Sequence, residues 1–317
     1  MNVLVIESGL YEYLYSGLHM PVIRYIILSL LIAGAASTHA QKSANHESPS
    51  RNRKWILPAS SAAAAAISLA GLNSLWYAQY PRTSLRSFND NHEWMQMDKV
   101  GHLFTCHQVA WAIHDAGIAA GYSRNASLLA GSLSTLGYMT TIELLDGHSA
   151  GWGFSWGDMA ANVAGISLFT AQQLAWNDQR IQLRFSYSHS PYASLRPALL
   201  GRNFQQRLIK DYNAQTYWCS FNIHRFLASG AVFPKWLNVA IGYGATGMTR
   251  SEMNEIDVDN FQRSREYYFS FDADLNRIQW PRRWMKITAR VISFIKIPGP
   301  TLEVRSDGKV RVHALFF

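Results

Sequence analysis

The chain has 317 residues, with 29 basic and 21 acidic side chains and a formal net charge of +8. Charged residues make up 16% of it, well below the roughly 25% of an average soluble domain, which excludes a disordered or coiled-coil chain. A mean hydropathy of −0.09 excludes a chain made mostly of transmembrane helices. The composition therefore predicts an envelope protein that is part membrane-associated and part polar.

Residues 1–40 are predicted to be a signal peptide. After Met20 and the basic Arg24, an apolar run precedes a stretch of small residues that ends at Ala40, which is the order found in secretory signals. Residues 1–19 fit no such pattern, so Met20 is an alternative start of the chain. An uncleaved membrane anchor is the alternative interpretation. Export and the lack of a recognition motif argue against a nucleic-acid partner, and the positive charge favours anionic lipid surfaces.

A polar and basic linker is predicted over 41–54, followed by an uncharged stretch over 55–78. The 24 residues of this stretch are long enough to cross a hydrocarbon core of about 30 Å. Alanine is its commonest residue, which makes the hydrophobic gain of insertion modest. Crossing the membrane and lying at its interface are therefore two open interpretations.

Three further helices are predicted, over 97–121, 124–145 and 156–177. Their uncharged windows, 125–142 and 159–177, are rich in small and polar residues, which suits close helix–helix contact better than exposure to lipid. Ala161 and Gly165 form a small-xxx-small pair, which allows helix backbones to approach closely. Residues 55–180 are therefore predicted to form a membrane-associated helical domain.

After Arg180 the hydrophobic period changes to two. Four runs alternate an apolar face with a polar or small one, as half-buried strands do. These runs are 181–188, 217–224, 237–244 and 267–272. Asp307-Gly308 predicts the turn of a hairpin between 301–305 and 309–316. Residues 286–297 are compatible with either strand or helix.

Residues 181–317 are accordingly predicted to form a β-rich domain, either a sheet or a small barrel. Six or seven strands with aromatic faces are typical of outer-membrane barrels, whereas the long connections 188–215 and 244–264 favour a sheet or small barrel in the periplasm. The predicted fold class is α+β, with an N-terminal membrane-associated helical bundle followed by a C-terminal antiparallel β domain.

Ionisable side chains interrupt the apolar helices and are the candidate site residues. Asp98 and His102 are four residues apart and share a helix face, with Lys99 beside them. Glu143 and Asp146 share a face at the end of the next helix. Such groups are costly inside an apolar bundle, so they pair with one another or mark a functional cavity.

The third helix contributes Asp158, Asn162 and Gly165, which fall on one stripe. Ser155-x-x-Asp158 before an apolar run is also a capping box, so both residues have a purely structural interpretation. Structural interpretations are equally open for the other candidates. Asp98 and Lys99 fit charges at the start of a helix, and His102 fits a hydrogen-bonded histidine of the core. Glu143 and Asp146 fit the solvated end of a helix.

Three motifs in this region carry a resemblance to a known family. They are Asp98-Lys99-x-x-His102, Glu143-x-x-Asp146, and Gly151-Trp152-Gly153-x-Ser155-Trp156-x-Asp158 with Asn162 and Gly165 following. Residues 98–165 resemble the YfiM-like family of predicted bacterial envelope proteins and, more distantly, the VanZ-like membrane proteins. Segments 88–94, 172–181 and 210–218 look like longer members of the YfiM-like family. Because no cysteine comes directly after the predicted signal, the comparison with its small lipoprotein members implies anchoring through apolar segments.

Two functions are predicted as alternatives. The first is a non-enzymatic anchor, scaffold or lipid-binding protein, in which the polar residues fix the arrangement of the helices and the sheet binds membrane lipid or an envelope protein. The second is a hydrolase or transferase acting on a lipid headgroup or a polyprenyl-phosphate. Its acid–base groups or divalent-cation ligands would be Asp98, His102, Glu143, Asp146 and Asp158, and Lys99 would neutralise phosphate. The sequence identifies no cofactor and none of the common catalytic motifs, which favours the first.

Overall fold

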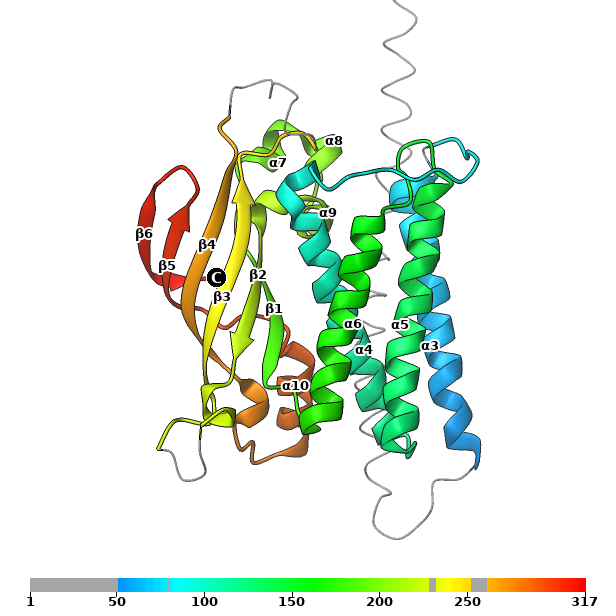
Figure 1. The fold of residues 1–317 in the computed structure, drawn as a ribbon, viewed down its shortest axis with the longest axis vertical. Coiled ribbons are helices and arrows are strands. Elements are labelled where there is room, and N and C mark those ends of the chain that lie inside the picture. The colour runs from blue at the N-terminus through cyan, green and yellow to red at the C-terminus, as the bar shows by residue number, and fades with distance from the viewer. Residues whose placement is uncertain (1–50, 79, 228–231, 252–260) are drawn as a thin grey trace, which may run out of the picture.

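The computed structural model describes residues 51–78, 80–227, 232–251 and 261–317 (Figure 1). The predicted signal peptide and most of the predicted linker lie outside the described residues. Within them, a helical N-terminal region is followed by a six-stranded antiparallel open sheet. The predicted α+β class and the order of its two parts are confirmed.

The long helices of the N-terminal region run side by side, along the longest axis of the molecule (Figure 1). Helix α3 begins at Arg51, inside the predicted linker, and a π-helix continues it. The three later helices agree closely with the predicted ranges, and a 3₁₀ turn leads into α4. The elements are α3 (Arg51–Leu72), the π-helix (Asn73–Tyr77), the 3₁₀ turn η2 (Glu93–Gln96), α4 (Met97–Ala119), α5 (Arg124–Gly147) and α6 (Trp156–Trp176).

Helix α4 is the central element, because it contacts α5 and α6 on one side and the sheet on the other (Figure 1). Cys106 packs with Met139 and Ile166 to form an apolar core between the three helices. On the opposite side of α4, the ring of Phe104 lies 6.0 Å from that of Phe185 and 5.5 Å from that of Tyr217. Both halves of the molecule are therefore built onto one helix.

Glycine makes the close approach of these helices possible. A Cβ atom on Gly165 of α6 would collide with the backbone carbonyl of Leu103 in α4. A Cβ atom on Gly131 of α5 would lie 2.5 Å from the carbonyl oxygen of Ala110, also in α4. The predicted role of Gly165 in close helix packing is therefore confirmed.

Helix α5 differs from the expectation in one respect. Ser127, Gly131 and Thr135 are buried, whereas Leu129 and Leu133 on the opposite face are exposed. By length and composition α5 can cross a membrane, although no membrane is present, and 28% of its apolar window is buried. The expected helix contacts are confirmed for one face of this window, while the other face is exposed and its surroundings stay untested.

The sheet is a simple meander in which each strand pairs antiparallel with its neighbour in sequence. The four predicted alternating runs all form strands, and the predicted hairpin turns at Gly308, whose φ of 85° favours glycine. The strands are β1 (Ile181–Tyr187), β2 (Gln215–Phe221), β3 (Leu237–Thr246), β4 (Ser264–Ala273), β5 (Gly299–Arg305) and β6 (Val310–Phe316).

The connections between strands contain short helices. Helix α10 begins at Arg283, before the segment that was compatible with strand or helix, and covers the first part of that segment as far as Ile292. The short helices are α7 (Tyr192–Leu195), α8 (Pro197–Leu200), α9 (Phe204–Lys210) and α10 (Arg283–Ile292), and the 3₁₀ turns are η3 (Tyr212–Ala214), η4 (Ile223–Arg225) and η5 (Leu275–Arg277).

The sheet buries its polar face. Inside it, the Arg184 guanidinium Nε lies 3.1 Å from Asp272 Oδ2, and the Ser220 hydroxyl donates to the same carboxylate at 2.8 Å. The Lys296 ammonium donates to the carbonyl oxygen of Phe271 at 2.9 Å and lies 4.8 Å from the centroid of the Trp218 ring. The predicted alternation is confirmed, but it is hydrogen-bonded polar groups that fill the interior.

The close approach of α4 and α6 predicts opposite effects for two glycine-to-alanine substitutions. Gly165→Ala should destabilise the protein by about 1–3 kcal/mol, because its methyl group overlaps the backbone of α4. Gly137→Ala in α5 meets no atom within 4 Å and should be neutral or stabilising by about 0.5–1 kcal/mol. The midpoint of thermal unfolding measures both. Equal midpoints for the two variants would contradict the proposed packing.

Candidate functional site

The candidate site begins at an unusual entry into α4. Trp94, Met95 and Gln96 have positive φ angles of 47°, 52° and 63°, so the chain turns sharply before the helix. Such a conformation costs about 1–3 kcal/mol for each non-glycine residue and persists only where packing holds it. Here Met95 is buried, and its carbonyl oxygen accepts a hydrogen bond from the Tyr243 hydroxyl of β3. The sheet therefore sets the direction in which α4 starts.

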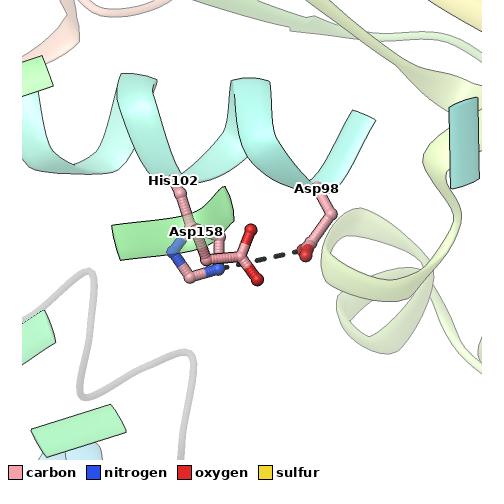
Figure 2. A group of neighbouring side chains, drawn as sticks. All are labelled: Asp98, His102 and Asp158. Carbon is pink, nitrogen blue, oxygen red and sulfur yellow. Dashed lines mark ion pairs between the residues drawn. The ribbon is translucent and has the colours of Figure 1, made fainter. Parts of the chain in front are cut away.

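Asp98, His102 and Asp158 meet at this end of the helical region. Figure 2 shows Asp98 and His102 on the same side of α4, with Asp158 approaching His102 from α6. One ligand atom of each lies within 4.8 Å of the others, and His102 Nε2 is 3.9 Å from Asp98 Oδ1. The shared helix face predicted for Asp98 and His102 is confirmed.

Lys99 is the cation at the centre of these carboxylates. Its Nζ lies 2.6 Å from Asp90 Oδ2, 2.9 Å from Asp158 Oδ1 and 3.7 Å from Asp98 Oδ2. The side chain is largely buried, as are those of Asp90 and Asp158. A buried ion pair of this kind requires its partners, because loss of one leaves the other charge unpaired away from water.

The other ring nitrogen of His102 faces Asn162 and Glu143. Nδ1 lies 3.0 Å from Asn162 Oδ1 and 3.7 Å from Glu143 Oε1. Glu143 Oε2 accepts a hydrogen bond of 3.2 Å from the backbone N–H of Ser155. Side chains from α4, α5 and α6 are thus linked through one histidine.

Ser155 confirms the predicted helix cap and also joins the cluster. Its hydroxyl oxygen accepts from the backbone N–H of Asp158 at 3.0 Å, which caps α6. The same hydroxyl donates to Asp90 Oδ1 at 2.6 Å. Ser155 and Asp158 therefore form the cap of α6 and are also members of the polar cluster.

Two members of the cluster, Asp90 and Tyr212, escaped the motif analysis. Asp90 lies in the loop before α4, and the Tyr212 hydroxyl, just before β2, donates to Asp98 Oδ1 at 2.6 Å. Each lies in a segment, 88–94 or 210–218, that was expected from the sequence to resemble the longer YfiM-like proteins. That resemblance was the available signal, since helical spacing cannot connect residues so distant along the chain.

Asp146 and Gly165 lie apart from the cluster. Asp146 is hydrogen-bonded to Tyr77, at the end of the π-helix, and burial raises the pKa of its carboxyl to about 7. Gly165 faces the backbone of α4 at Leu103. Of the predicted residues, the structure therefore brings together Asp98, Lys99, His102, Glu143, Ser155, Asp158 and Asn162.

Burial and excess negative charge shift the pKa values within the cluster. Burial raises the pKa of Asp158, and the charge of Asp98 raises it further, to about 8, against the opposing effect of His102 and Lys99. Burial likewise raises the pKa of Glu143. For His102 burial lowers the pKa, but the surrounding carboxylates outweigh burial and hold it above its ordinary value. The negative charge of the carboxylates is therefore compensated by bound protons as well as by the Lys99 ammonium.

The same geometry permits a test of the cation hypothesis. Asp98, His102 and Asp158 have the spacing of a metal site. However, the Lys99 ammonium already lies 2.9 Å from Asp158 Oδ1, where it would compete with a metal ion for this carboxylate. The residues thus fit a proton-and-lysine cluster better than a resident divalent cation.

The fold and the cluster define an α+β protein whose acid-rich centre joins a helical region to a sheet. Residues 87–172 match the model of a family described as predicted periplasmic lipoprotein (DUF2279). No curated protein and no solved structure matches the chain. The match covers every cluster residue except Tyr212 and confirms a membrane-associated location in the bacterial cell envelope. It states no activity, and the more distant likeness to VanZ-like proteins stays a prediction.

The raised pKa of Asp158 predicts a stability that depends on pH. The folded protein holds the Asp158 proton up to about pH 8, whereas the unfolded chain releases it near the ordinary pKa of 3.8. The folded state therefore binds more protons across this interval, and the free energy of unfolding should fall as the pH rises through it. Asp158→Asn should flatten the curve, as measured by urea denaturation from pH 5 to pH 9. An unchanged slope would contradict the assignment.

The Tyr212 hydrogen bond predicts a second effect on stability. Tyr212→Phe removes a half-buried donor to a carboxylate and should lower the free energy of unfolding by about 1–2 kcal/mol. Tyr267→Phe, on the exposed face of β4, is the matched control and should change it by less than about 0.5 kcal/mol. Equal effects from the two variants would show that Asp98 does not depend on Tyr212.

Proposed function

We propose that the protein is a non-enzymatic scaffold of the cell envelope and that its polar cluster is a structural joint. The observation that carries the proposal is the hydrogen bond from Tyr212, just before β2, to Asp98, at the start of α4. Together with the contacts of Lys99 and Ser155, it connects the loop at Asp90, α4, α6 and the sheet in one buried network.

The internal contacts of the cluster support this role. Asp90 accepts from Ser155 and pairs with Lys99, Asp98 accepts from Tyr212, and His102 faces Asn162. A substrate would have to displace these internal partners before it reached a catalytic group. Residue pairs of this kind fix one arrangement of packed elements, which is what a scaffold requires.

The position of a cavity among the described residues points the same way. This cavity, of about 210 Å³, lies on the polar inner side of the sheet. Its lining includes Tyr268, Glu303, Arg311 and His313 but no member of the cluster. This cavity and the acid–base groups of the cluster thus lie in different parts of the described structure.

The alternative, a hydrolase or transferase for a lipid headgroup or polyprenyl-phosphate, is favoured by one observation. Asp98, His102 and Asp158 lie close enough for a histidine to exchange protons with two carboxylates. In this alternative Lys99 would bind phosphate, for which it would have to leave Asp90 and Asp158. Because binding phosphate would break these two ion pairs, we rank the enzymatic function below the scaffold function.

Complementation of a deletion strain separates the two functions. Strains carrying the wild type, His102→Ala, or the exposed control His148→Ala are compared for envelope integrity and for lipid composition by mass spectrometry. For a scaffold, all three proteins at equal abundance should restore the envelope equally, and cross-linking should capture a stoichiometric envelope protein partner. A lipid change that the wild type and the control reverse, but an equally abundant His102→Ala does not, would support the enzyme and refute the scaffold.

A further inference from the structure

The outer face of the sheet carries continuous apolar rows that cross all six strands. In the pairing register, Leu183 of β1, Cys219 of β2, Ile241 of β3, Phe269 of β4, Leu302 of β5 and Val312 of β6 form one row. A second row is formed by Phe185, Tyr217, Tyr243, Tyr267, Val304 and Val310. Every member of both rows is apolar or aromatic.

Helix α4 covers only the beginning of these rows. Leu183 is buried, and the Gln108 amide of α4 donates to its carbonyl oxygen at 2.5 Å. Further along the same row, Ile241 is 53% exposed, Phe269 50%, Leu302 39% and Val312 80%. The surface that packs against α4 at β1 thus continues uncovered across β3 to β6.

Hydrophobic burial within the chain does not account for this face. The opposite side of the same strands is filled by buried polar groups such as Arg184, Ser220 and Asp272. Strands with a polar interior and an apolar exterior are the pattern found where the exterior meets lipid. Strands β3 and β4 have ten residues each, the length of strands that match a hydrocarbon core of about 30 Å.

The distribution of charge indicates the kind of surface that this face meets. Among the described residues, every aspartate and glutamate is buried or half-buried, whereas many basic side chains are exposed. The exposed bases are Arg82, Arg86, Arg124, Arg202, Arg225, Lys235, Arg282, Arg283, Lys286, Lys309 and Arg311. The described surface is therefore positively charged, which complements anionic headgroups.

Bases and tryptophans gather at one end of the sheet. Lys235 and Trp236 lie just before β3, and Arg282, Trp284 and Lys286 lie at the start of α10, at the lower end in Figure 1. All five side chains are exposed. Tryptophan and basic residues at the edge of an apolar surface are typical of the headgroup level of a membrane.

We propose that the uncovered outer face of β3–β6 contacts the hydrocarbon region of a phospholipid bilayer, with the bases at its lower end on anionic headgroups. This surface is separate from the polar cluster, so the proposal holds whether the protein is a scaffold or an enzyme. A second copy of the chain on the same face is the competing occupant. Its own surface would be equally basic, so the two partners would repel each other where a bilayer of anionic lipid attracts.

Vesicle flotation with the full chain tests the proposal. The purified protein is mixed with vesicles of phosphatidylethanolamine and phosphatidylglycerol, or of phosphatidylcholine alone, and centrifuged. Phe269→Ser with Leu302→Ser removes a cross-strand pair from the apolar face. Leu195→Ser with Leu199→Ser, at exposed positions of α7 and α8, is the matched control. Lys235→Glu with Lys286→Glu tests the basic end, and circular dichroism verifies that each variant is folded.

The proposal predicts that the face variant partitions at least about tenfold less onto both kinds of vesicle, while the control behaves as the wild type. The charge variant should lose its preference for phosphatidylglycerol. Flotation of the folded face variant at the wild-type level would overturn the proposal. A second result would also overturn it: the wild type forms a concentration-dependent dimer, and the face variant loses the dimer but still binds vesicles. In that case a second copy of the chain, and not the bilayer, would occupy the face. If the face variant unfolds, Phe269→Ser and Val312→Ser, each as a single substitution at an exposed position, replace it under the same criteria.

Discussion

The ammonium group of Lys99 permits carboxylates from separate segments of the chain to meet away from water. Asp90 and Asp158 lie within 3 Å of it, and Asp98 lies at 3.7 Å. Without this cation, Asp90 would lose its partner at 2.6 Å, and the network that joins the loop before α4 to α6 would be weakened. Because α4 carries the sheet on its other side, the relation between the two halves of the molecule depends on the same contacts.

Buried polar groups are distributed differently in the two halves of the molecule. In the helical region the ionisable residues of the cluster lie at one end, and further polar pairs, such as Ser132 with Thr170 and His114 with Gln173, lie along the helices beside apolar contacts. In the sheet, polar groups such as Arg184 and Asp272 share the interior with an apolar cluster that contains Trp218 and Tyr268. Both arrangements leave apolar side chains on the outside, which accords with a protein associated with a membrane.

Local periodicity predicted the elements well because helices and strands depend on residues close in sequence. The helical spacing of Asp98 and His102 and the cap at Ser155 were confirmed for the same reason. Periodicity alone could not decide which face of each strand is buried, because alternation is identical when the sheet is turned over. Nor could it place Asp90 or Tyr212 in the cluster, since their contacts depend on tertiary packing across many residues.

The polar interior of the sheet bears on how its strands find their register. In an ordinary sheet a slip of one residue is penalised because it turns the apolar side chains out to water. Here the same slip would turn them inward, so in water hydrophobic burial favours the wrong register. What opposes it is the loss of internal pairs such as Arg184 with Asp272 and Trp218 with Ser186. The sheet is therefore specified by electrostatics and hydrogen bonds, and an apolar surrounding during folding would reinforce the native choice.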